Sequence, residues 1–296
     1  MNTQANNASI VPRPIPTTQL LYWSIRRELM EYRSIYLAPA AIGAVIVLGF
    51  GFVLVGLPHL VSSAMALSPE KRHDAISQPF EVVAGLIMAA AFIVSFYYAL
   101  DTLYGERRDR SILFWKSLPV SDLTTVLAKA LVLLVILPVI AIAVTLLTEG
   151  IVLSLSIAVL AAHGLSVAAF WAQLAPIQMM NGLLYHIVTV HILWYAPLYC
   201  WLMLISAWSK RAPLLWALLP PFAIVVFERV AFHTSYFLNF IEDRFAGGSG
   251  HGPMIDQEMR MQIVHFIITP GLWYGLLFSA AFLFTAARLR RARGPI

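Results

Sequence analysis

Charged residues are scarce in this sequence. Only 12% of its 296 residues are Asp, Glu, Lys or Arg, and 60% are hydrophobic, whereas soluble domains usually carry about a quarter charged residues. Too little polar surface is present to face water on all sides. This composition excludes a water-soluble globular protein, and we expect one membrane domain without a substantial soluble domain.

The usual signatures of catalysis and cofactor binding are also missing. The single cysteine, Cys200, lies in an apolar run, which excludes a disulfide framework and a thiol-rich metal site. No Gly-x-x-x-x-Gly-Lys-Ser/Thr occurs, so the chain has no P-loop for a nucleotide. His186 and His191 are five residues apart, which turns the second about 140° from the first around an α-helix, unlike the i, i+4 spacing of paired metal ligands. We therefore predict no catalytic residue, no metal and no cofactor bound by this chain.

What the sequence does contain is a series of long apolar runs. The first begins only near Tyr36, too late and too long for a cleaved signal peptide, so we expect a retained anchor. Each run has 20 to 26 residues, enough for a helix to cross the roughly 30 Å of bilayer hydrocarbon. The six runs are Tyr36–Leu57, Phe80–Leu100, Leu123–Leu147, Gly182–Ala207, Ala212–Ala231 and Phe266–Ala287. The predicted fold is all-α, a polytopic transmembrane helical bundle of about six spans over residues 36–287.

The segment before the first span mixes apolar and charged residues. Thr17 and Thr18 are candidate N-caps for a helix from Gln19 to Ser34. The expected helix is amphipathic, and we predict that it lies along the membrane surface with its aromatic side toward lipid. Residues 1–35 would thus form an N-terminal cytoplasmic segment that ends in an interfacial helix.

Charge decides the number of crossings. With six spans, 15 of the 20 Lys and Arg residues lie on one side, as the positive-inside rule requires of the cytoplasmic side, and both termini are then cytoplasmic. The apolar stretch Ile151–Trp171 is not counted as a seventh span, because that would place Lys210, Arg211 and the basic tail 288–296 outside. Residues 148–181 are expected to form an outer segment, either re-entrant or interfacial. We interpret the net charge of +5 as a topology signal, not as a sign of nucleic-acid binding.

One charged pair lies toward the outer end of the fifth span. Glu228 and Arg229 are adjacent there, and intramembrane charge indicates either a functional site, here an outer gate, or a structural ion pair. A second outer insertion, residues 232–265, follows this pair. It contains the glycine-rich patch Ala246–Pro253, which predicts a flexible turn between two short helices.

The inner loop between the second and third spans, residues 101–122, is richer than a connector requires. A charged cluster, Glu106–Arg110, precedes the apolar patch Ile112–Trp115. Exposed apolar residues beside basic groups are typical of a docking surface for a cytoplasmic partner. The same pattern also fits a loop anchored in the lipid headgroups, with Trp115 at the interface and arginines on phosphates. Physical reasoning leaves both open.

The stretch Glu106–Ser121, with its acidic-basic start, small residue, apolar patch and Leu-Pro-Val-Ser end, resembles the coupling region of membrane subunits of type-2 ABC exporters. The layout agrees over nearly the whole chain, although only about 16 residues form a specific motif. The outer segment 148–181 departs from the family, since it is longer and more apolar than expected. This puts the outer gate and the substrate route of the family in doubt.

The resemblance implies a permease in the bacterial inner membrane, working as a homodimer with separate cytoplasmic ATPase subunits that hold ATP and magnesium. An ATPase-coupled component in sensing or envelope assembly that moves no substrate is the alternative. An amphipathic or peptide-like substrate is favoured over other hydrophobic ones. The residues implied to couple to the ATPase are Glu106, Arg107, Arg108, Asp109, Arg110, Ser111, Phe114, Trp115 and Lys116. Those implied for the family's elbow helix are Trp23, Arg26, Arg27 and Arg33.

Overall fold

A computed structural model describes residues 16–118, 120–245 and 263–296, and of Glu70 only the backbone. In this part of the chain every regular element is a helix. Residues 263–268 are helical, and π-helical segments occupy η1 (Val132–Ile136) and η2 (Ile187–Trp194). The α-helices are α1 (Thr17–Glu31), α2 (Ser34–Val53), α3 (Leu57–Met65), α4 (Pro69–Asp101), α5 (Tyr104–Arg108), α6 (Ile112–Ser117), α7 (Asp122–Leu131), α8 (Leu137–Ala162), α9 (Val167–Leu174), α10 (Pro176–His186), α11 (Ala196–Trp208), α12 (Pro213–Ala231), α13 (Tyr236–Phe245) and α15 (Pro270–Ala292).

Five helices in the described residues are long and apolar enough to cross a membrane. They are Ser34–Val53, Lys71–Arg108, Asp122–Ala162, Pro213–Ala231 and Pro270–Ala292. A sixth crossing is obtained if Val167–Trp194 and Ala196–Trp208, which meet at a bend of 42°, count as one broken span. The prediction of an all-α polytopic bundle with about six spans is confirmed.

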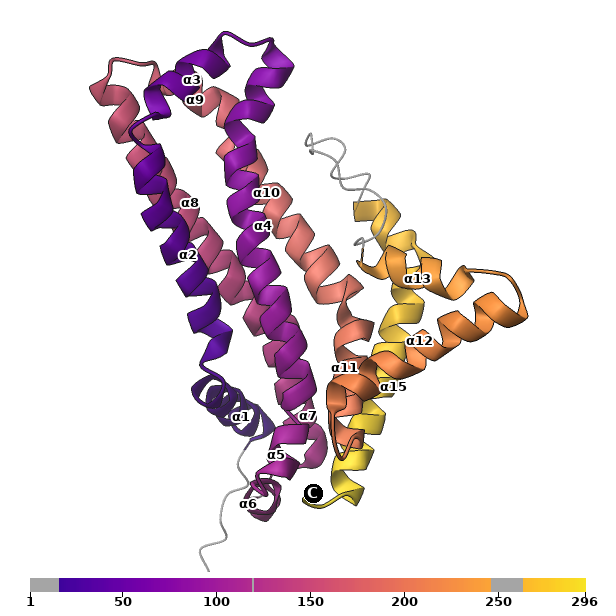
Figure 1. Cartoon of the computed structure of the whole chain (residues 1–296). Helices are drawn as coiled ribbons and strands as arrows, with labels where there is room; N and C mark the ends of the chain where they lie inside the picture. The colour runs from indigo at the N-terminus through magenta and orange to yellow at the C-terminus, as the bar shows by residue number, and fades with distance from the viewer. Residues whose placement is uncertain (1–15, 119, 246–262) are drawn as a thin grey trace, which may run out of the picture.

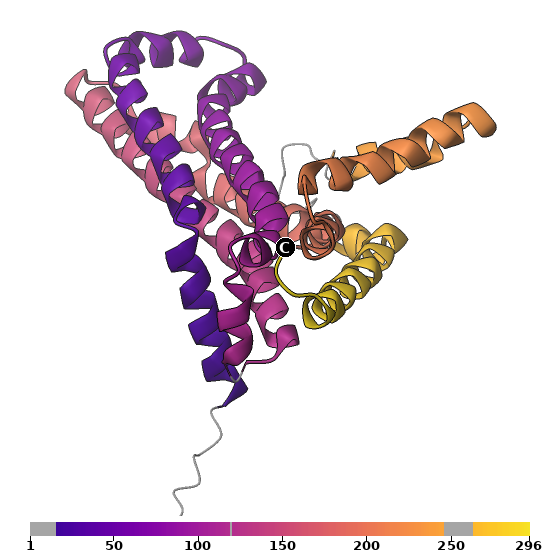
Figure 2. The same ribbon diagram turned by 60° about the horizontal axis from the view of Figure 1, so that its bottom comes forward.

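The long helices are arranged in two groups (Figure 1). In one group α2 packs against α4 and α8. In the other α11 packs against α15, and α4 joins the groups through its contact with α11. Helix α1 lies across the base of the first group, near α5 and α6, and the C-terminus is at the same end (Figures 1 and 2). We call this the charged end, and the opposite end, which holds α3 and α9, the far end.

Helix α12 differs from the other spans because it projects away from both groups (Figures 1 and 2). Of its residues only Ala217 is buried, while leucine and phenylalanine side chains along it, such as Leu218 and Phe222, are exposed. A helix that is apolar all round is stable in lipid or against another apolar surface. Its exposure is therefore compatible with a membrane-spanning helix.

Helix α1 begins slightly earlier than predicted. It starts at Thr17, directly after Pro16, whose φ of −61° and ψ of 142° place it outside the helix. The expected caps Thr17 and Thr18 are therefore the first helical residues. The helix ends at Glu31, and after a short turn α2 begins at Ser34.

The outer segment 148–181 is helical over most of its length. Its first part, up to Ala162, is the end of α8. Helices α7, η1 and α8 together form one continuous helix of 41 residues, about 60 Å long at 1.5 Å per residue. The rest forms α9 and the first half of α10. Together with α3 and the start of α4, these helices bury an apolar far-end cluster of Leu57, Val61, Ala64, Ile76, Phe80, Val152, Leu160, Phe170 and Leu174. The prediction that the outer segment 148–181 is either re-entrant or interfacial stays a prediction.

The histidine pair shows where the sequence argument was wrong. Residues 187–194 form a π-helix, in which the Tyr195 N–H donates to the Val190 carbonyl five residues earlier at 2.9 Å. Residues five apart therefore lie close together. The ring centroids of His186 and His191 are 5.6 Å apart, instead of pointing to different sides. Among the described residues, no three His, Cys, Asp or Glu side chains are grouped as metal ligands.

Helix α13 is anchored to the bundle by a buried arginine. The Arg244 guanidinium lies 4.1 Å from the Trp194 ring and donates to the Trp194 carbonyl at 3.1 Å. Gly275 of α15 leaves room for it, because a Cβ there would stand 2.8 Å from Arg244 Nη2. Part of the second outer insertion, including the whole of the predicted glycine-rich turn, lies outside the described residues.

Candidate functional site at the charged end

Ionic side chains from four helices meet in the interior of the charged end. Glu28 of α1 is fully buried, with 0% of its surface exposed. Its Oε1 accepts from Lys129 Nζ of α7 at 2.8 Å, and its Oε2 accepts from the Tyr98 hydroxyl of α4 at 3.0 Å. Arg27 also pairs with it. Burial alone would raise the pKa of Glu28, but Lys129 and Arg27 outweigh burial and hold that pKa below its ordinary value.

Glu106 of α5 stands at the centre of the same cluster. Its Oε1 lies 3.1 Å from Arg27 Nη2 and 3.2 Å from Lys129 Nζ. Its Oε2 accepts from both Nη2 and Nε of Arg290, at 3.1 and 3.3 Å, so both of these charge-assisted bonds end on one carboxylate oxygen. Arg290 of α15 then pairs with Asp122 at the start of α7.

We call these six residues the ionic cluster: Arg27, Glu28, Glu106, Asp122, Lys129 and Arg290. Three are acidic and three are basic, so the cluster is neutral. Four of the six side chains are no more than 3% exposed. Removing one partner from such a buried pair leaves an uncompensated charge, which typically costs about 3–5 kcal/mol. The cluster therefore fixes α1, α5, α7 and α15 relative to one another.

Helix α5 is also fastened to the end of α11. The backbone N–H groups of Leu103 and Tyr104 donate to the Ser206 hydroxyl at 3.1 and 2.8 Å. The buried Arg107 donates through Nη1 to the carbonyls of Ala207 at 2.7 Å and Ser209 at 3.0 Å. A movement of α5 must therefore also move α11.

Helix α6 has a fastened face and an exposed face. Ile112 is completely buried, and Lys116 donates to the Arg291 and Arg293 carbonyls at 3.3 and 3.0 Å. By contrast, the Leu113 and Phe114 side chains are about 60% exposed. The element that holds an apolar surface outward is thus tied from behind to the bundle.

The structure separates the predicted coupling residues into two sets. Glu106 and Arg107 are buried and bonded within the chain, and Trp115 is half-buried under the Arg27 guanidinium, 4.0 Å from its ring. The exposed set is Arg108, Asp109, Arg110, Phe114 and Lys116, of which Arg108 pairs with Asp109. In addition, Ser111 donates to the Glu106 carbonyl at 3.4 Å. Contact with an ATPase stays a prediction, and in this structure the exposed set alone is free to make it.

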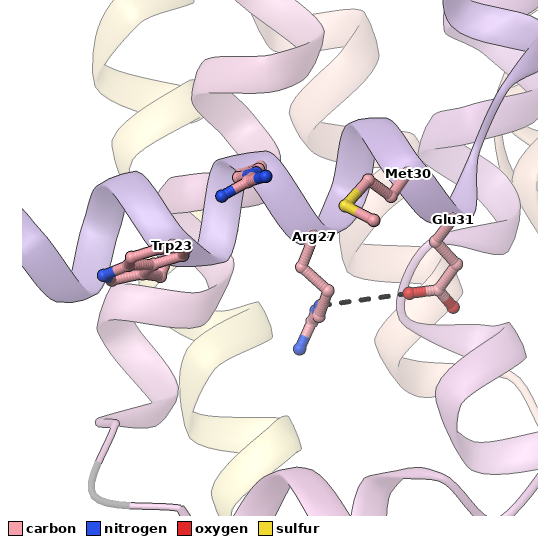
Figure 3. Close-up of a pocket in the computed structure, with 5 residues that line it drawn as sticks. Trp23, Arg27, Met30 and Glu31 are labelled. Carbon is pink, nitrogen blue, oxygen red and sulfur yellow. Dashed lines mark ion pairs between the residues drawn. The ribbon is translucent and has the colours of Figure 1, made fainter.

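Three of the four predicted elbow residues line one shallow groove. It has a volume of 470 Å³ and is formed by Trp23, Arg26, Arg27, Met30 and Glu31 (Figure 3). Burial, followed by the nearby Glu28 carboxylate, raises the pKa of Glu31. The fourth residue, Arg33, is exposed in the turn between α1 and α2.

The predicted outer-gate residues do not pair with each other in the described part of the chain. Glu228 instead accepts from the Thr234 hydroxyl at 2.7 Å and from the Phe237 N–H at 2.9 Å. Arg229 bonds the Ser235 hydroxyl. Both side chains thus fasten the turn before α13, and a gating role stays a prediction.

Sequence reasoning missed most of the ionic cluster, namely Glu28, Asp122, Lys129 and Arg290. One signal could have found it, because Lys129 lies inside a predicted span, where a charged residue requires a partner. The identity of that partner depended on the position of α1, which no spacing rule supplies.

Comparison with known proteins identifies no relative of this chain. The sequence matches no protein-family model, and no curated protein or solved structure shows significant similarity to it.

Proposed function

We propose that the chain is the permease subunit of an ATP-driven ABC exporter. In this proposal two copies form the translocation path in the plasma membrane, and separate ATPase subunits bind the charged end from the cytoplasm. The chain itself carries no catalysis. ATP and magnesium are held by the partner.

The observation that carries the proposal is the two-sided α5–α6 loop. Its outer face offers exposed Leu113 and Phe114 beside Arg108, Asp109 and Arg110, a combination of apolar and charged groups typical of a transient protein interface. Its inner face is fixed through Glu106 and Arg107 to α1, α7, α11 and α15. A force applied to the loop by a partner would therefore reach four other helices, as coupling between ATP hydrolysis and a membrane path requires.

The exposed helix α12 supports the homodimer. Its leucine and phenylalanine side chains are largely uncovered by the rest of the chain. A second copy presenting the same surface would bury them in a symmetric interface. Lipid would cover whatever remains.

The test is copurification of the partner. This chain, tagged, is co-expressed with the ATPase encoded nearest its gene, and the ATPase yield is compared between wild type, Phe114→Ala and Arg108→Glu. Both substitutions should release the ATPase because both side chains are exposed at the proposed interface. Phe52→Ala is the control, since Phe52 is 86% exposed near the far end and should have no effect.

Two outcomes would contradict the exporter. If no ATPase copurifies in any lipid, the loop is better explained as a lipid anchor. If the ATPase copurifies but sealed vesicles containing the complex move no amphipathic peptide or lipid on ATP addition, the chain belongs to a sensing or assembly complex.

A further inference from the structure

The groove on α1 carries both signs of charge on one face (Figure 3). Its lining residues recur at helical spacing, so they form one stripe along the helix. Arg26 and Arg27 lie toward its middle, and Glu31 lies one turn further on. The exposed apolar parts of Trp23 and Met30 flank these charges.

The charges in this groove are not equally engaged. Arg26 makes no ion pair among the described residues, and its guanidinium stands 5.3 Å from the Trp23 ring. Glu31 has one ionic neighbour in the described chain, Arg27 Nε at 3.9 Å, which is too far for a hydrogen bond. Arg27 Nε also lacks a hydrogen-bond partner in the described residues, but this atom is buried. The groove thus holds one exposed guanidinium without an ion pair, that of Arg26, and one carboxylate without a close donor, that of Glu31.

The position of the groove favours a membrane lipid as occupant. α1 ends at Glu31 and the apolar α2 begins at Ser34, so the groove is held at the depth where the first span leaves the hydrocarbon. Exposed Tyr22 and Trp23, with ring centroids 5.5 Å apart, are the side chains that membrane interfaces enrich. A lipid headgroup is the ligand present at that depth.

We propose that this groove binds a zwitterionic phospholipid headgroup with a primary ammonium, of the phosphatidylethanolamine type. The phosphate oxygens would accept from the exposed Arg26 guanidinium. The ammonium would donate to Glu31, and Trp23 and Met30 would contact the glycerol region.

The charge order selects this headgroup over the common alternatives. A purely anionic headgroup such as phosphatidylglycerol would gain the arginines but leave Glu31 facing negative charge. Phosphatidylcholine would present a trimethylammonium, which has no N–H to donate to a carboxylate. Only a headgroup with an anion and a hydrogen-bonding cation matches both ends of the groove. The inference does not depend on the exporter proposal.

Native mass spectrometry of the full chain tests it. The purified protein is mixed with equal amounts of phosphatidylethanolamine, phosphatidylcholine and phosphatidylglycerol of identical acyl chains, and bound lipids are counted. We expect phosphatidylethanolamine to dominate. Arg26→Ala should lower its binding about tenfold, as the loss of a charged hydrogen bond predicts, and Glu31→Gln should remove its advantage over phosphatidylcholine.

Arg288→Ala is the matched control, because Arg288 is also exposed and lies 5.0 Å from an aromatic ring, that of Phe284. This variant should bind lipids as the wild type does. Equal binding of the three lipids, a preference for phosphatidylglycerol, or no effect of Arg26→Ala would each overturn the proposal. An Arg26→Ala variant that keeps its lipid but loses a copurifying ATPase would assign the groove to a protein partner instead.

Discussion

The two ends of the molecule are stabilised in different ways. At the charged end, six ionic side chains in mutual contact fix four helices. At the far end, nine apolar residues from α3, α4, α8 and α9 pack without any ion pair among them. The first arrangement is directional, since each charge requires a partner at a defined distance. The second depends on volume and burial and has no required partners.

This difference bears on how each end can work. An ionic cluster has few alternative arrangements, so it transmits a displacement from one helix to the next instead of absorbing it. An apolar cluster can repack at modest cost, which suits an end where helices shift relative to one another. We infer that the charged end serves as a rigid joint and the far end as the adaptable part.

Removing the central cation of the ionic cluster should give the largest effect. Lys129→Met keeps the side-chain length but leaves Glu28 and Glu106 without their shared ammonium. We expect a loss of about 3–5 kcal/mol in the free energy of unfolding, because two buried carboxylates lose a cationic partner and the cluster then holds three acids against two bases. The measurement is reversible unfolding in mixed micelles with increasing SDS.

Two variants sharpen this prediction. Lys210→Met removes an exposed lysine and should change stability by less than about 0.5 kcal/mol. In the double variant Lys129→Met/Glu28→Gln, the Glu28 substitution removes a carboxylate that loss of the Lys129 ammonium had left with Arg27 alone as its cationic partner. The combined loss should therefore be smaller than the sum of the single losses, and strict additivity would show that the cluster does not act as a unit.

The far end should respond to volume instead of charge. Leu160 is completely buried in the far-end cluster, and Leu160→Ala should lower the free energy of unfolding by about 2–4 kcal/mol by leaving a cavity. Leu160→Met should cost less than about 1.5 kcal/mol because the volume is kept. If the same unfolding assay shows equal losses of stability for the two variants, the far end depends on the particular side chain at position 160 and not on buried volume alone.

Acid should weaken the charged end first. The folded chain holds the pKa of Glu28 below its ordinary 4.5, so this carboxylate contributes stability that is fully present above pH of about 4.5 and is lost as pH falls through the folded pKa. Thermal unfolding between pH 7 and pH 3 should show a steeper decline for wild type than for Glu28→Gln. Glu242→Gln alters an exposed acid and should leave the decline unchanged. If the stability of Glu28→Gln declined with falling pH in parallel with that of wild type, Glu28 would not be the source of the acid sensitivity.

The sequence was sufficient to predict the membrane spans but not the ionic cluster that holds their helices together. Apolar runs such as Ala212–Ala231 coincide closely with helices, because crossing hydrocarbon imposes length and composition on a contiguous segment. The partnership of Glu28 with Lys129 joins residues 101 positions apart, and depends on how α1 folds back onto α7. The π-helical turn that brings His186 and His191 together was equally hidden, because the 3.6-residue period of an α-helix predicts different sides for residues five apart.

The smallest expected effect concerns the turn between α5 and α6. Arg110 has a φ of 60°, a left-handed conformation that costs a non-glycine residue about 1–2 kcal/mol. Arg110→Gly should relieve this strain but add about 0.4–1 kcal/mol of chain entropy to the unfolded state, for a net gain of about 0.5 kcal/mol. Arg110→Ala keeps the Cβ and should leave the free energy of unfolding near the wild-type value.

This substitution also links stability to the proposed function. If the exposed Arg110 charge contacts an ATPase, Arg110→Gly should stabilise the chain and yet lower ATPase copurification, because a strained residue is retained at a site where it is needed. Arg110→Ala should lower copurification without the gain in stability. If Arg110→Gly were more stable and captured the ATPase fully, Arg110 would lie outside the docking surface, which would then be confined to α6 and Arg108.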